Sequence, residues 1–581
     1  MRIIHFILTF LLFNCCVKPI PNQNYIKSHS IIFEYKNKEG LIEISDDIKN
    51  VVLLDEDYCL EVVLNYNDME IDYDNIDSKE LRTASKKYYS SMNNEIIGSF
   101  NLNCDDLIVS EYTPFVFAIY KGINAFQRSN AVAESLKNEP QIKELRITPY
   151  HLYDSNFDEP FLKIENSKTR VGTDYIEDNY PVGTPYTGYG IKIGILDDGY
   201  FNENDPIFNG YSVENVYDTT PGNDPHPMKV ASVIVSSNGI APSSSIYYVD
   251  VNSDYGYCGI ERLINKNVDI VNMSIGAASC MNNGSYNPGL EIYLDRIYLS
   301  THIIMVAAAD NSLNKSGSGG FVCLPALCAN VISVGSVKKA GDLWVPSDFS
   351  SYNCKNDVHS NPNIVAVGES RKIPYVEESK NGTSYSTPAV TAAIALYFEK
   401  NGVKPLPDVL SVLAATANHV DIDYTPHTIQ LVDGNGNYTG ETIYCTNTLK
   451  ANGLYERTGA GELDITRLLG YNNVQLPSNT SYSNTNYRFL SQHYINSGYK
   501  VKICLAWDRY ADSSSLGTLP EFDLFLKYTY FSDVVSNTSS LSTNMKIIYA
   551  TISSTEDYKI YLRPYSHYYQ RFVNYGFRIY I

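Results

Sequence analysis

Three short segments of this 581-residue sequence each place a reactive side chain where an enzyme could use it. Asp197 follows the apolar run IKIGIL, His226 lies in PHPMKVAS, and Ser384 lies in NGTSYSTPAVTAAIAL. Taken singly, each has a plain structural explanation: an acidic turn, a structural histidine and a helix cap. Taken together, a carboxylate, an imidazole and a hydroxyl are the groups that carry out nucleophilic acyl transfer.

The local sequence around each of these residues suits that chemistry. Residues 191–196 are typical of a buried strand, so the carboxylate of Asp197 at its end can be desolvated and can orient an imidazole. A proline follows His226, as is tolerated in the first turn of a helix. The tight turn before Ser384 places the hydroxyl at a helix start, where free backbone N–H groups and the helix dipole favour developing negative charge.

The segment that contains all three residues predicts an α/β unit. Near-continuous apolar runs alternate with helical segments, which indicates a parallel sheet covered on both faces. Ligand sites in such sheets lie at the carboxyl ends of the strands. The predicted strands are residues 191–196, 245–251, 268–273, 303–309 and 331–334.

Different patterns flank this unit on both sides. Residues 25–165 combine the strand-like runs LEVVL and PFVFAIY with the helical AFQRSNAVAESLKN, which predicts a small α+β unit. Residues 166–189 are rich in Asp, Asn, Gly, Pro and Tyr and are typical of a linker. Residues 476–581 contain short strand candidates between polar turns, which predicts a β-sandwich.

The three motifs resemble, in order and context, those of the subtilisin-like serine protease (subtilase) family. IKIGILDDG, PHPMKVAS and NGTSYSTPAVTAAIAL are similar to the family's Asp, His and Ser motifs. The resemblance implies a catalytic triad of Asp197, His226 and Ser384, in the chain order of subtilisin. It covers roughly residues 185 to 470 and implies a subtilisin-like peptidase domain with a parallel sheet over residues 190–470.

Two further segments extend the resemblance. VDIVNMSIG is similar to the family's substrate-binding strand, which implies that Ser274, Ile275 and Gly276 pair with the substrate backbone by strand addition. IIMVAAADNS is similar to the strand that leads to the oxyanion hole, which implies that Asn311 stabilises the oxyanion together with the backbone N–H of Ser384.

The resemblance implies a secreted serine endopeptidase that hydrolyses protein or peptide substrates through an acyl-enzyme. This chemistry requires no metal or organic cofactor. Residues 25–165 resemble an inhibitory prodomain, so the chain's own prodomain is an expected partner, cleaved in self-processing between about 165 and 185. The segments CLAWDRYAD and EFDLFL resemble β-sandwich domains of secreted subtilases, where Asp508, Asp512 and Asp523 are either a structural calcium site or ordinary turn acids.

Two departures from the family pattern leave other functions open. Pro227-Met228-Lys229 stands where the family has Gly-Thr-His, and Asp310 stands where it has Gly before the oxyanion Asn. A cation near His226 disfavours the imidazolium, and an anion beside the oxyanion hole opposes developing negative charge. A catalytically silent subtilase fold that binds peptides, or a surface adhesin that acts through its β-sandwich, are therefore the alternatives.

The composition and the N-terminal segment limit the binding partners and the location that we expect for the protein. A net charge of −20 and a pI near 5.0 argue against nucleic-acid binding, because phosphate contacts need clustered Lys and Arg. A basic start followed by the apolar run 3–13 predicts a signal peptide within residues 1–20 and a secreted or cell-surface protein. Cys15 or Cys16 could carry a lipid anchor. No later apolar run is long enough for a transmembrane helix.

Overall fold

The computed structural model describes parts of all three units predicted from the sequence. The predicted signal peptide, Cys15, Cys16 and residues 166–184 of the predicted linker lie outside the described residues. No helix among those described is long and apolar enough to cross a membrane. The described residues are 33–35, 57–66, 69, 78–149, 185–216, 224–251, 258–276, 288–315, 320–340, 343–352, 361–376, 378–418, 427–433, 438–470, 479–481, 487–509, 522–528, 533–538, 544–564 and 572–580.

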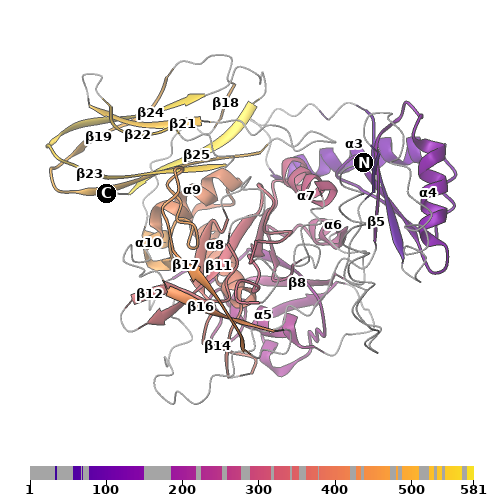
Figure 1. Ribbon diagram of the computed structural model, residues 1–581, viewed down its shortest axis with the longest axis horizontal. Coiled ribbons are helices and arrows are strands. Elements are labelled where there is room, and N and C mark those ends of the chain that lie inside the picture. Colours follow the sequence, from indigo (N-terminus) through magenta and orange to yellow (C-terminus); the bar gives the residue numbers. More distant parts are fainter. Residues whose placement is uncertain are drawn as a thin grey trace.

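An eight-stranded sheet forms the centre of the molecule (Figure 1). Its order is β12-β11-β10-β9-β6-β8-β7, with β13 paired to β11. Neighbouring strands are parallel, except that β12 is antiparallel to β11. The predicted α/β fold is therefore confirmed. The strands are β6 (Lys192–Asp197), β7 (Ser212–Asn215), β8 (Ser245–Asp250), β9 (Ile270–Met273), β10 (Ile304–Ala308), β11 (Ile332–Ala340), β12 (Leu343–Pro346) and β13 (Ile364–Val367).

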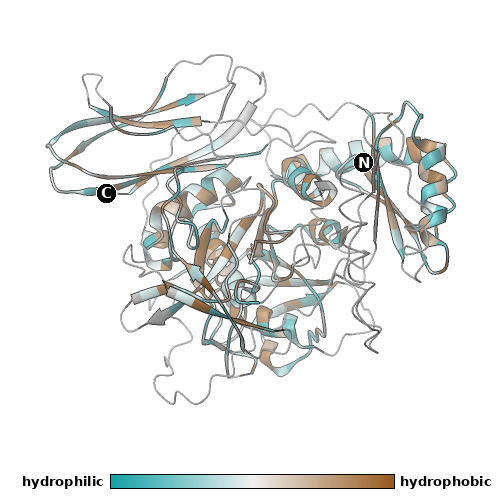
Figure 2. Ribbon diagram, in the orientation of Figure 1, coloured by the Kyte–Doolittle hydropathy of each residue, from teal (hydrophilic) through white to brown (hydrophobic). Residues whose placement is uncertain are grey.

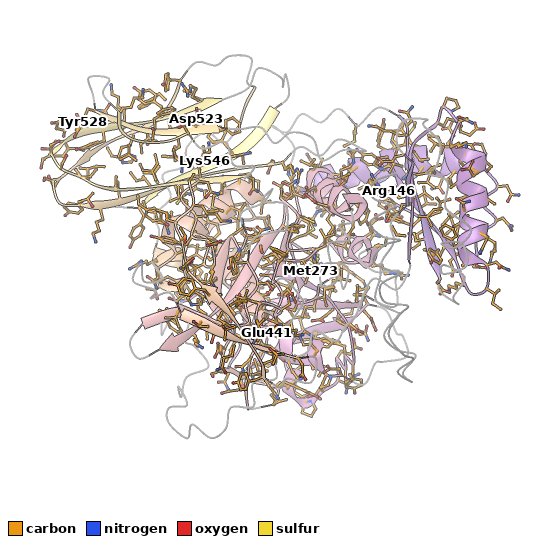
Figure 3. All side chains as sticks on the ribbon, viewed as in Figure 1. Arg146, Met273, Glu441, Asp523, Tyr528 and Lys546 are labelled. Atoms are coloured by element: carbon orange, nitrogen blue, oxygen red, sulfur yellow. The ribbon has the colours of Figure 1, made fainter. Side chains whose placement is uncertain are left out.

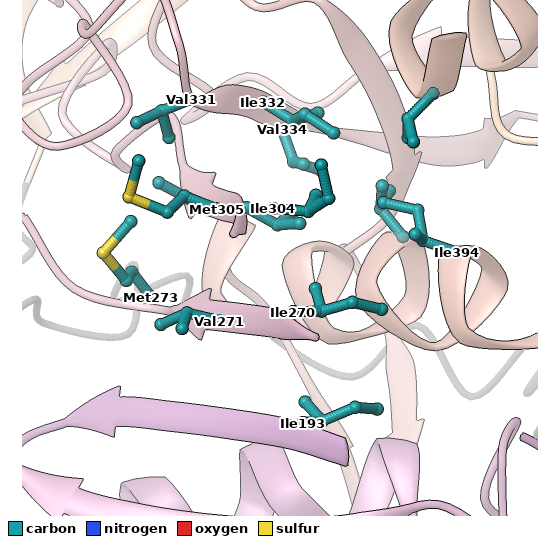
Figure 4. Close-up of a cluster of buried hydrophobic side chains, with 14 of the residues drawn as sticks. Ile193, Ile270, Val271, Met273, Ile304, Met305, Val331, Ile332, Val334 and Ile394 are labelled. Atoms are coloured by element: carbon teal, nitrogen blue, oxygen red, sulfur yellow. The ribbon is translucent and has the colours of Figure 1, made fainter. Parts of the chain in front are cut away.

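Helices cover both faces of this sheet. A Cβ on Gly194 of β6 would lie 2.8 Å from Leu263 of α6, so the alternating neighbour Ile193 points to the opposite face. On that face Figure 4 shows Ile193 and Ile270 in one cluster with Ile394 of α8. The helices of this unit are α5 (His226–Ile234), α6 (Gly259–Asn265), α7 (Pro288–Thr301), α8 (Thr383–Asn401), α9 (Leu406–Thr416) and α10 (Ile465–Gly470).

A separate five-stranded antiparallel sheet precedes this unit, in the order β1-β5-β2-β4-β3. Helix α4 packs on the sheet, as its sequence pattern predicts. The twenty-residue helix α3 lies against α7 and is missing from the sequence prediction. The elements are β1 (Phe33–Tyr35), β2 (Tyr58–Leu64), α3 (Ser78–Ile97), β3 (Asp106–Val109), β4 (Phe115–Tyr120), α4 (Ala125–Leu136) and β5 (Ile142–Pro149).

Two four-stranded antiparallel sheets follow, in the orders β18-β25-β20-β23 and β19-β24-β21-β22. They enclose a common hydrophobic cluster that includes Trp507, Phe522 and Tyr558. Strands β20 and β25 also pack on α9. The strands are β18 (Asn479–Ser481), β19 (Arg488–Ile495), β20 (Lys500–Trp507), β21 (Phe522–Tyr528), β22 (Asp533–Asn537), β23 (Met545–Thr551), β24 (Glu556–Pro564) and β25 (Phe572–Tyr580).

The C-terminal sheets share one core with the central unit. Cys504 and Ile547 belong to the same buried cluster as the side chains of α8 and α9. The backbones also approach closely, because a Cβ on Gly576 would lie 2.1 Å from the carbonyl oxygen of Pro407. Figure 2 shows hydrophobic positions concentrated among the strands and helices of the central unit.

Candidate active site

The end of β6 and the start of α5 bring Asp197 and His226 together. His226 Nδ1 lies 2.9 Å from Asp197 Oδ1, and the same oxygen accepts a hydrogen bond from the backbone N–H of Asp198 (2.8 Å). Asp197 is fully buried. Because the carboxylate holds Nδ1, the other ring nitrogen, Nε2, is the one available to act as a base.

Opposing influences set the pKa of His226. Burial, the largest of them, lowers the pKa of the imidazole, whereas the Asp197 carboxylate and, more weakly, Asp224 raise it. Lys229 lowers the pKa of His226, as the sequence predicts, but its effect is the smallest and it lies 3.8 Å from Asp224. The net result is a pKa of His226 above its ordinary value, which favours the imidazolium.

The residues that replace the family's Gly-Thr-His are accommodated by their surroundings. Pro227 occupies the first turn of α5, and Met228 is buried in the core. Gly199 faces this turn with φ 125°, and a Cβ there would lie 2.3 Å from the carbonyl oxygen of Asp224 and 3.2 Å from Pro227. A glycine in the loop after β6 therefore leaves room for the proline ring.

Ser384 lies in the first turn of α8 and is buried. Its hydroxyl donates a hydrogen bond to the carbonyl oxygen of Ser274 (3.1 Å), and the Ser274 hydroxyl donates to the carbonyl oxygen of Ser384 (2.9 Å). The ring of the next residue, Tyr385, lies with its centroid 5.9 Å from that of His226. The start of α8, which carries Ser384, thus lies beside His226.

Asn311, three residues beyond the end of β10, is fixed by the start of α8. Its side-chain oxygen accepts hydrogen bonds from the backbone N–H (2.8 Å) and the hydroxyl (3.0 Å) of Thr383. Its side-chain nitrogen lies 3.6 Å from the position that a Cβ on Gly382 would occupy. The side-chain oxygen of Asn311 therefore binds the start of α8, and its side-chain N–H groups face the turn that precedes Ser384.

Asp310 adopts a backbone conformation with φ 92°, in the region that favours glycine. Its buried carboxylate accepts hydrogen bonds from the hydroxyls of Ser312 and Ser351, the latter at 3.3 Å. Burial raises the pKa of Asp310, and the hydrogen bonds from Ser312 and the Asn311 backbone oppose that rise. The carboxylate is thus engaged with these hydroxyls, beside the backbone that carries Asn311.

Ser274, Ile275 and Gly276 follow β9 directly and are buried. A chain of side-chain hydrogen bonds that sequence reasoning missed connects this segment to α8. Thr391 donates to the Asn272 oxygen (3.0 Å), and the Asn272 amide nitrogen donates to the Ser274 hydroxyl (3.0 Å). The only signal in the sequence is a single Asn within an apolar strand.

The acidic residues predicted as a possible calcium site are only partly described. Asp512 lies outside the described residues, and Asp508 is buried. Asp523 of β21 lies 2.6 Å from Arg563 and 3.5 Å from Lys546, which Figure 3 labels and which belongs to β23 of the other sheet. Within the described ranges no group of three or more His, Cys, Asp or Glu side chains is placed to hold a metal ion. The calcium site stays a prediction.

Comparison with known proteins matches the central unit to one family. The family model described as "Subtilase family" matches residues 188–461. Subtilisin E of Bacillus subtilis (strain 168) is 30% identical over 313 residues, which cover 51% of this chain and 77% of that protein. Subtilisin of Bacillus pumilus is 31% identical over 252 residues, which cover 40% of this chain and 86% of that protein.

Solved structures are also similar. Fervidolysin from Fervidobacterium pennivorans, described as a keratinolytic enzyme related to subtilisin, is 15% identical with a TM-score of 0.45. The match covers 88% of this chain and 69% of that one. The serine protease of Aeromonas sobria is 15% identical with a TM-score of 0.39, over 67% of this chain and 89% of that one.

Proposed function

This chain belongs to the subtilase family and is a serine endopeptidase, and on that premise we propose that Asp197, His226 and Ser384 are its catalytic triad. The observation that carries the proposal is the 2.9 Å contact between His226 Nδ1 and the buried Asp197 carboxylate. A desolvated carboxylate there fixes the tautomer in which Nε2 is the free base, and it stabilises the imidazolium that forms in the reaction.

The reaction begins when the Ser384 hydroxyl leaves the Ser274 carbonyl oxygen, its acceptor in this structure, and rotates to His226. Exchanging one hydrogen bond for another costs little, on the order of 1 kcal/mol at most. Ser384 Oγ then attacks the substrate carbonyl carbon while His226 Nε2 takes its proton. His226 returns that proton to the leaving amine, and water hydrolyses the acyl-enzyme with His226 again as base.

Asn311 and the backbone N–H of Ser384 are the proposed oxyanion donors. The hydrogen bonds from Thr383 support this role, because they consume the amide oxygen of Asn311 and leave its N–H groups for a ligand. In subtilisin, a relative of this chain, removal of one such donor costs about 3 to 4 kcal/mol. Ser274, Ile275 and Gly276 would hold the substrate backbone by strand addition.

The five-stranded N-terminal unit is the proposed prodomain and inhibitor. Its docking on the central unit supports this role. The Ser110 hydroxyl (2.6 Å) and the Glu111 backbone N–H (2.8 Å) donate to Glu261 of α6. Phe115 stacks edge-on against Tyr293 of α7, with centroids 5.7 Å apart. We further propose a signal peptide in residues 1–20, secretion or surface display, self-cleavage between about 165 and 185, and a C-terminal β-sandwich over 476–581.

One observation favours a second function, that of a subtilase fold that holds peptides without cutting them. The Ser384 hydroxyl donates to Ser274 rather than to His226 in this structure. If that arrangement persisted with substrate, the nucleophile would stay inactive. The departures at Pro227, Lys229 and Asp310 add little to this case, because Gly199 leaves room for Pro227, Lys229 has the smallest effect on the pKa of His226, and two hydroxyls engage the Asp310 carboxylate.

Intact mass of the secreted protein, beside Ser384→Ala, tests the proposal. We expect the wild type to lose an N-terminal piece that ends near residue 165 to 185 and Ser384→Ala to stay whole. Ser386→Ala is the matched control, since Ser386 is a buried serine one half-turn along the same helix whose hydroxyl bonds Thr383. A fluorophosphonate probe should label the wild type and Ser386→Ala only. Folded wild type that is neither cut nor labelled would favour the silent peptide-binding fold.

A further inference from the structure

A cavity of about 390 Å³ lies where helix α3 of the N-terminal unit meets the turn after α6. Figure 1 shows α3 beside α7, at the boundary between the two units. Three cationic side chains of α3, Arg82, Lys86 and Lys87, line the cavity, with Asn265 and Asn267 opposite them. A local concentration of positive charge is unexpected in a chain whose net charge is −20.

Arg82 is buried in this wall without a paired carboxylate. Its Nε donates to the carbonyl oxygen of Thr301 (3.0 Å) and its Nη1 to that of Val268 (2.7 Å). Burial lowers the pKa of Arg82, and the charge of Asp269 offsets this only in part. A buried guanidinium that hydrogen-bonds only neutral carbonyl oxygens keeps a charge that Asp269 compensates only in part, and a neighbouring anion would stabilise it.

The two lysines differ in whether a carboxylate pairs with them. Lys86 pairs with Glu111 (2.8 Å) and donates to the Asn265 side-chain oxygen (2.8 Å). Lys87 is exposed at the rim, and in the described part of the chain no carboxylate pairs with it. After Glu111 is assigned to Lys86, the cavity therefore has two cations, Arg82 and Lys87, without a paired anion.

We propose that this cavity is a binding site for a multivalent oxyanion, such as phosphate or pyrophosphate, either free or carried by a larger molecule. Two unpaired cations match an anion with more than one charge. The planar guanidinium of Arg82 supplies directed donors, and Lys87 supplies a flexible point charge at the opening. The volume is ample for a phosphate or pyrophosphate with its remaining water.

An anion at this site would hold the two units together. Lys87 belongs to the N-terminal unit, whereas Asn265 and the carbonyl groups that fix Arg82 belong to the central unit. A ligand that binds only the docked arrangement stabilises it by mass action. We therefore expect slower release of the N-terminal unit at high oxyanion concentration. That expectation rests on the proposed prodomain role, whereas the binding of the anion does not depend on that role.

The test uses the full chain with Ser384→Ala, which needs no catalysis and therefore stays informative even if the peptidase proposal fails. Sodium phosphate and pyrophosphate are titrated by calorimetry at constant ionic strength in chloride. We expect saturable binding that Lys87→Ala weakens at least about 4-fold, the effect of removing one charge roughly 5 Å away in water-like surroundings. Lys79→Ala removes the same charge from an exposed position of the same helix, outside the cavity, and should leave the affinity unchanged.

Two sets of probes distinguish a free anion from one carried by a larger molecule. Binding of free phosphate or pyrophosphate supports a small-molecule ligand. Binding of a sulfated or phosphorylated oligosaccharide alone, with the same dependence on Lys87, supports an oxyanion carried by a larger molecule. No saturable binding of any of these probes, or equal weakening by Lys79→Ala and Lys87→Ala, would overturn the proposal, because the charges would then act only by diffuse screening.

Discussion

Arg509 joins the C-terminal sheets to helix α7 through a buried ion pair, and its replacement tests how firmly the two parts are joined. The guanidinium lies 2.5 Å from Glu291 and 3.6 Å from Asp295. Arg509 is only 2% exposed and both carboxylates are fully buried. Asn330 adds two hydrogen bonds to the backbone of Arg509, at 2.9 Å each. Arg509→Met would keep most of the side-chain volume and remove the charge.

The expected cost follows from the two carboxylates that remain. Loss of one partner of a buried pair costs about 3 to 5 kcal/mol, because the other charge stays buried and uncompensated. With an unfolding entropy of about 2.1 cal/mol/K per residue, a cooperative unit of roughly 390 residues would lose about 4 to 6 °C in Tm. We expect this loss only if the C-terminal sheets unfold together with the central unit.

The loss of Tm in Arg509→Met should change with pH in a defined direction. Burial raises the pKa of Asp295 above its ordinary value, and Arg509 opposes that rise. A carboxyl group whose folded pKa is raised destabilises the fold progressively as pH rises from its unfolded pKa through its folded pKa. Removal of Arg509 raises the folded pKa further. The difference in Tm between the wild type and Arg509→Met should therefore be largest near pH 8 and shrink near pH 5.

Differential scanning calorimetry in the Ser384→Ala background measures both effects without self-digestion. Lys266→Met is the control, since Lys266 forms a 2.5 Å pair with Glu214 in which both side chains are well exposed. A surface pair of this kind contributes at most about 1 kcal/mol. If Arg509→Met and Lys266→Met lower Tm equally, or if the C-terminal sheets melt in a separate transition, the joined core inferred from these contacts is wrong.

Three further predictions concern the site and the C-terminal contact. Asn311→Ala should lower kcat/KM on a peptide substrate about 10²- to 10³-fold with little change in KM, and a rise in KM alone would refute its role at the oxyanion. Lys229→Met removes a charge that lowers the pKa of His226, so the acid limb of the kcat/KM profile should move to higher pH, and a move to lower pH would contradict the assignment of His226 as base. Gly576→Ala should lower Tm, because its Cβ would lie 2.1 Å from the Pro407 carbonyl oxygen, whereas Gly470→Ala, with nothing within 4 Å, should not.

Of the eight strands of the central sheet, β7, β12 and β13 are missing from the prediction, whereas the other five, β6, β8, β9, β10 and β11, could be predicted from the sequence because they are buried on both faces. Such strands are continuous apolar runs, and the predicted limits 245–251 and 303–309 agree to within one residue at each end with β8 and β10. The positions of Asp197 and His226 relative to β6 and α5 could be predicted for a related reason. Asp197 is the last residue of β6 and His226 is the first residue of α5, and the sequence pattern of each element is clear.

Helix α3 could not be predicted in the same way. Its buried positions at four-residue spacing are Leu81, Ser85, Tyr89, Asn93 and Ile97, so no apolar stripe marks them. Tyr89 and Asn93 are buried because they find partners in distant segments. The Asn93 amide, for instance, donates to the carbonyl oxygens of Ser110 and Thr113. Local periodicity carries no information about such partners, and the same holds for the pair of Arg509 and Glu291.

Helix α7 explains why the central unit depends on the segments that flank it. Glu291 and Asp295 of this helix face Arg509 of the C-terminal segment, whereas Tyr293 and Arg296 contact Phe115 and Tyr89 of the N-terminal unit. A helix that buries two carboxylates and a guanidinium is costly unless each has a partner. The C-terminal segment supplies a partner for the two carboxylates, and this partner would stay in place after the proposed removal of the N-terminal unit. The stable structural unit of this peptidase therefore includes the C-terminal sheets as well as the segment that carries the triad.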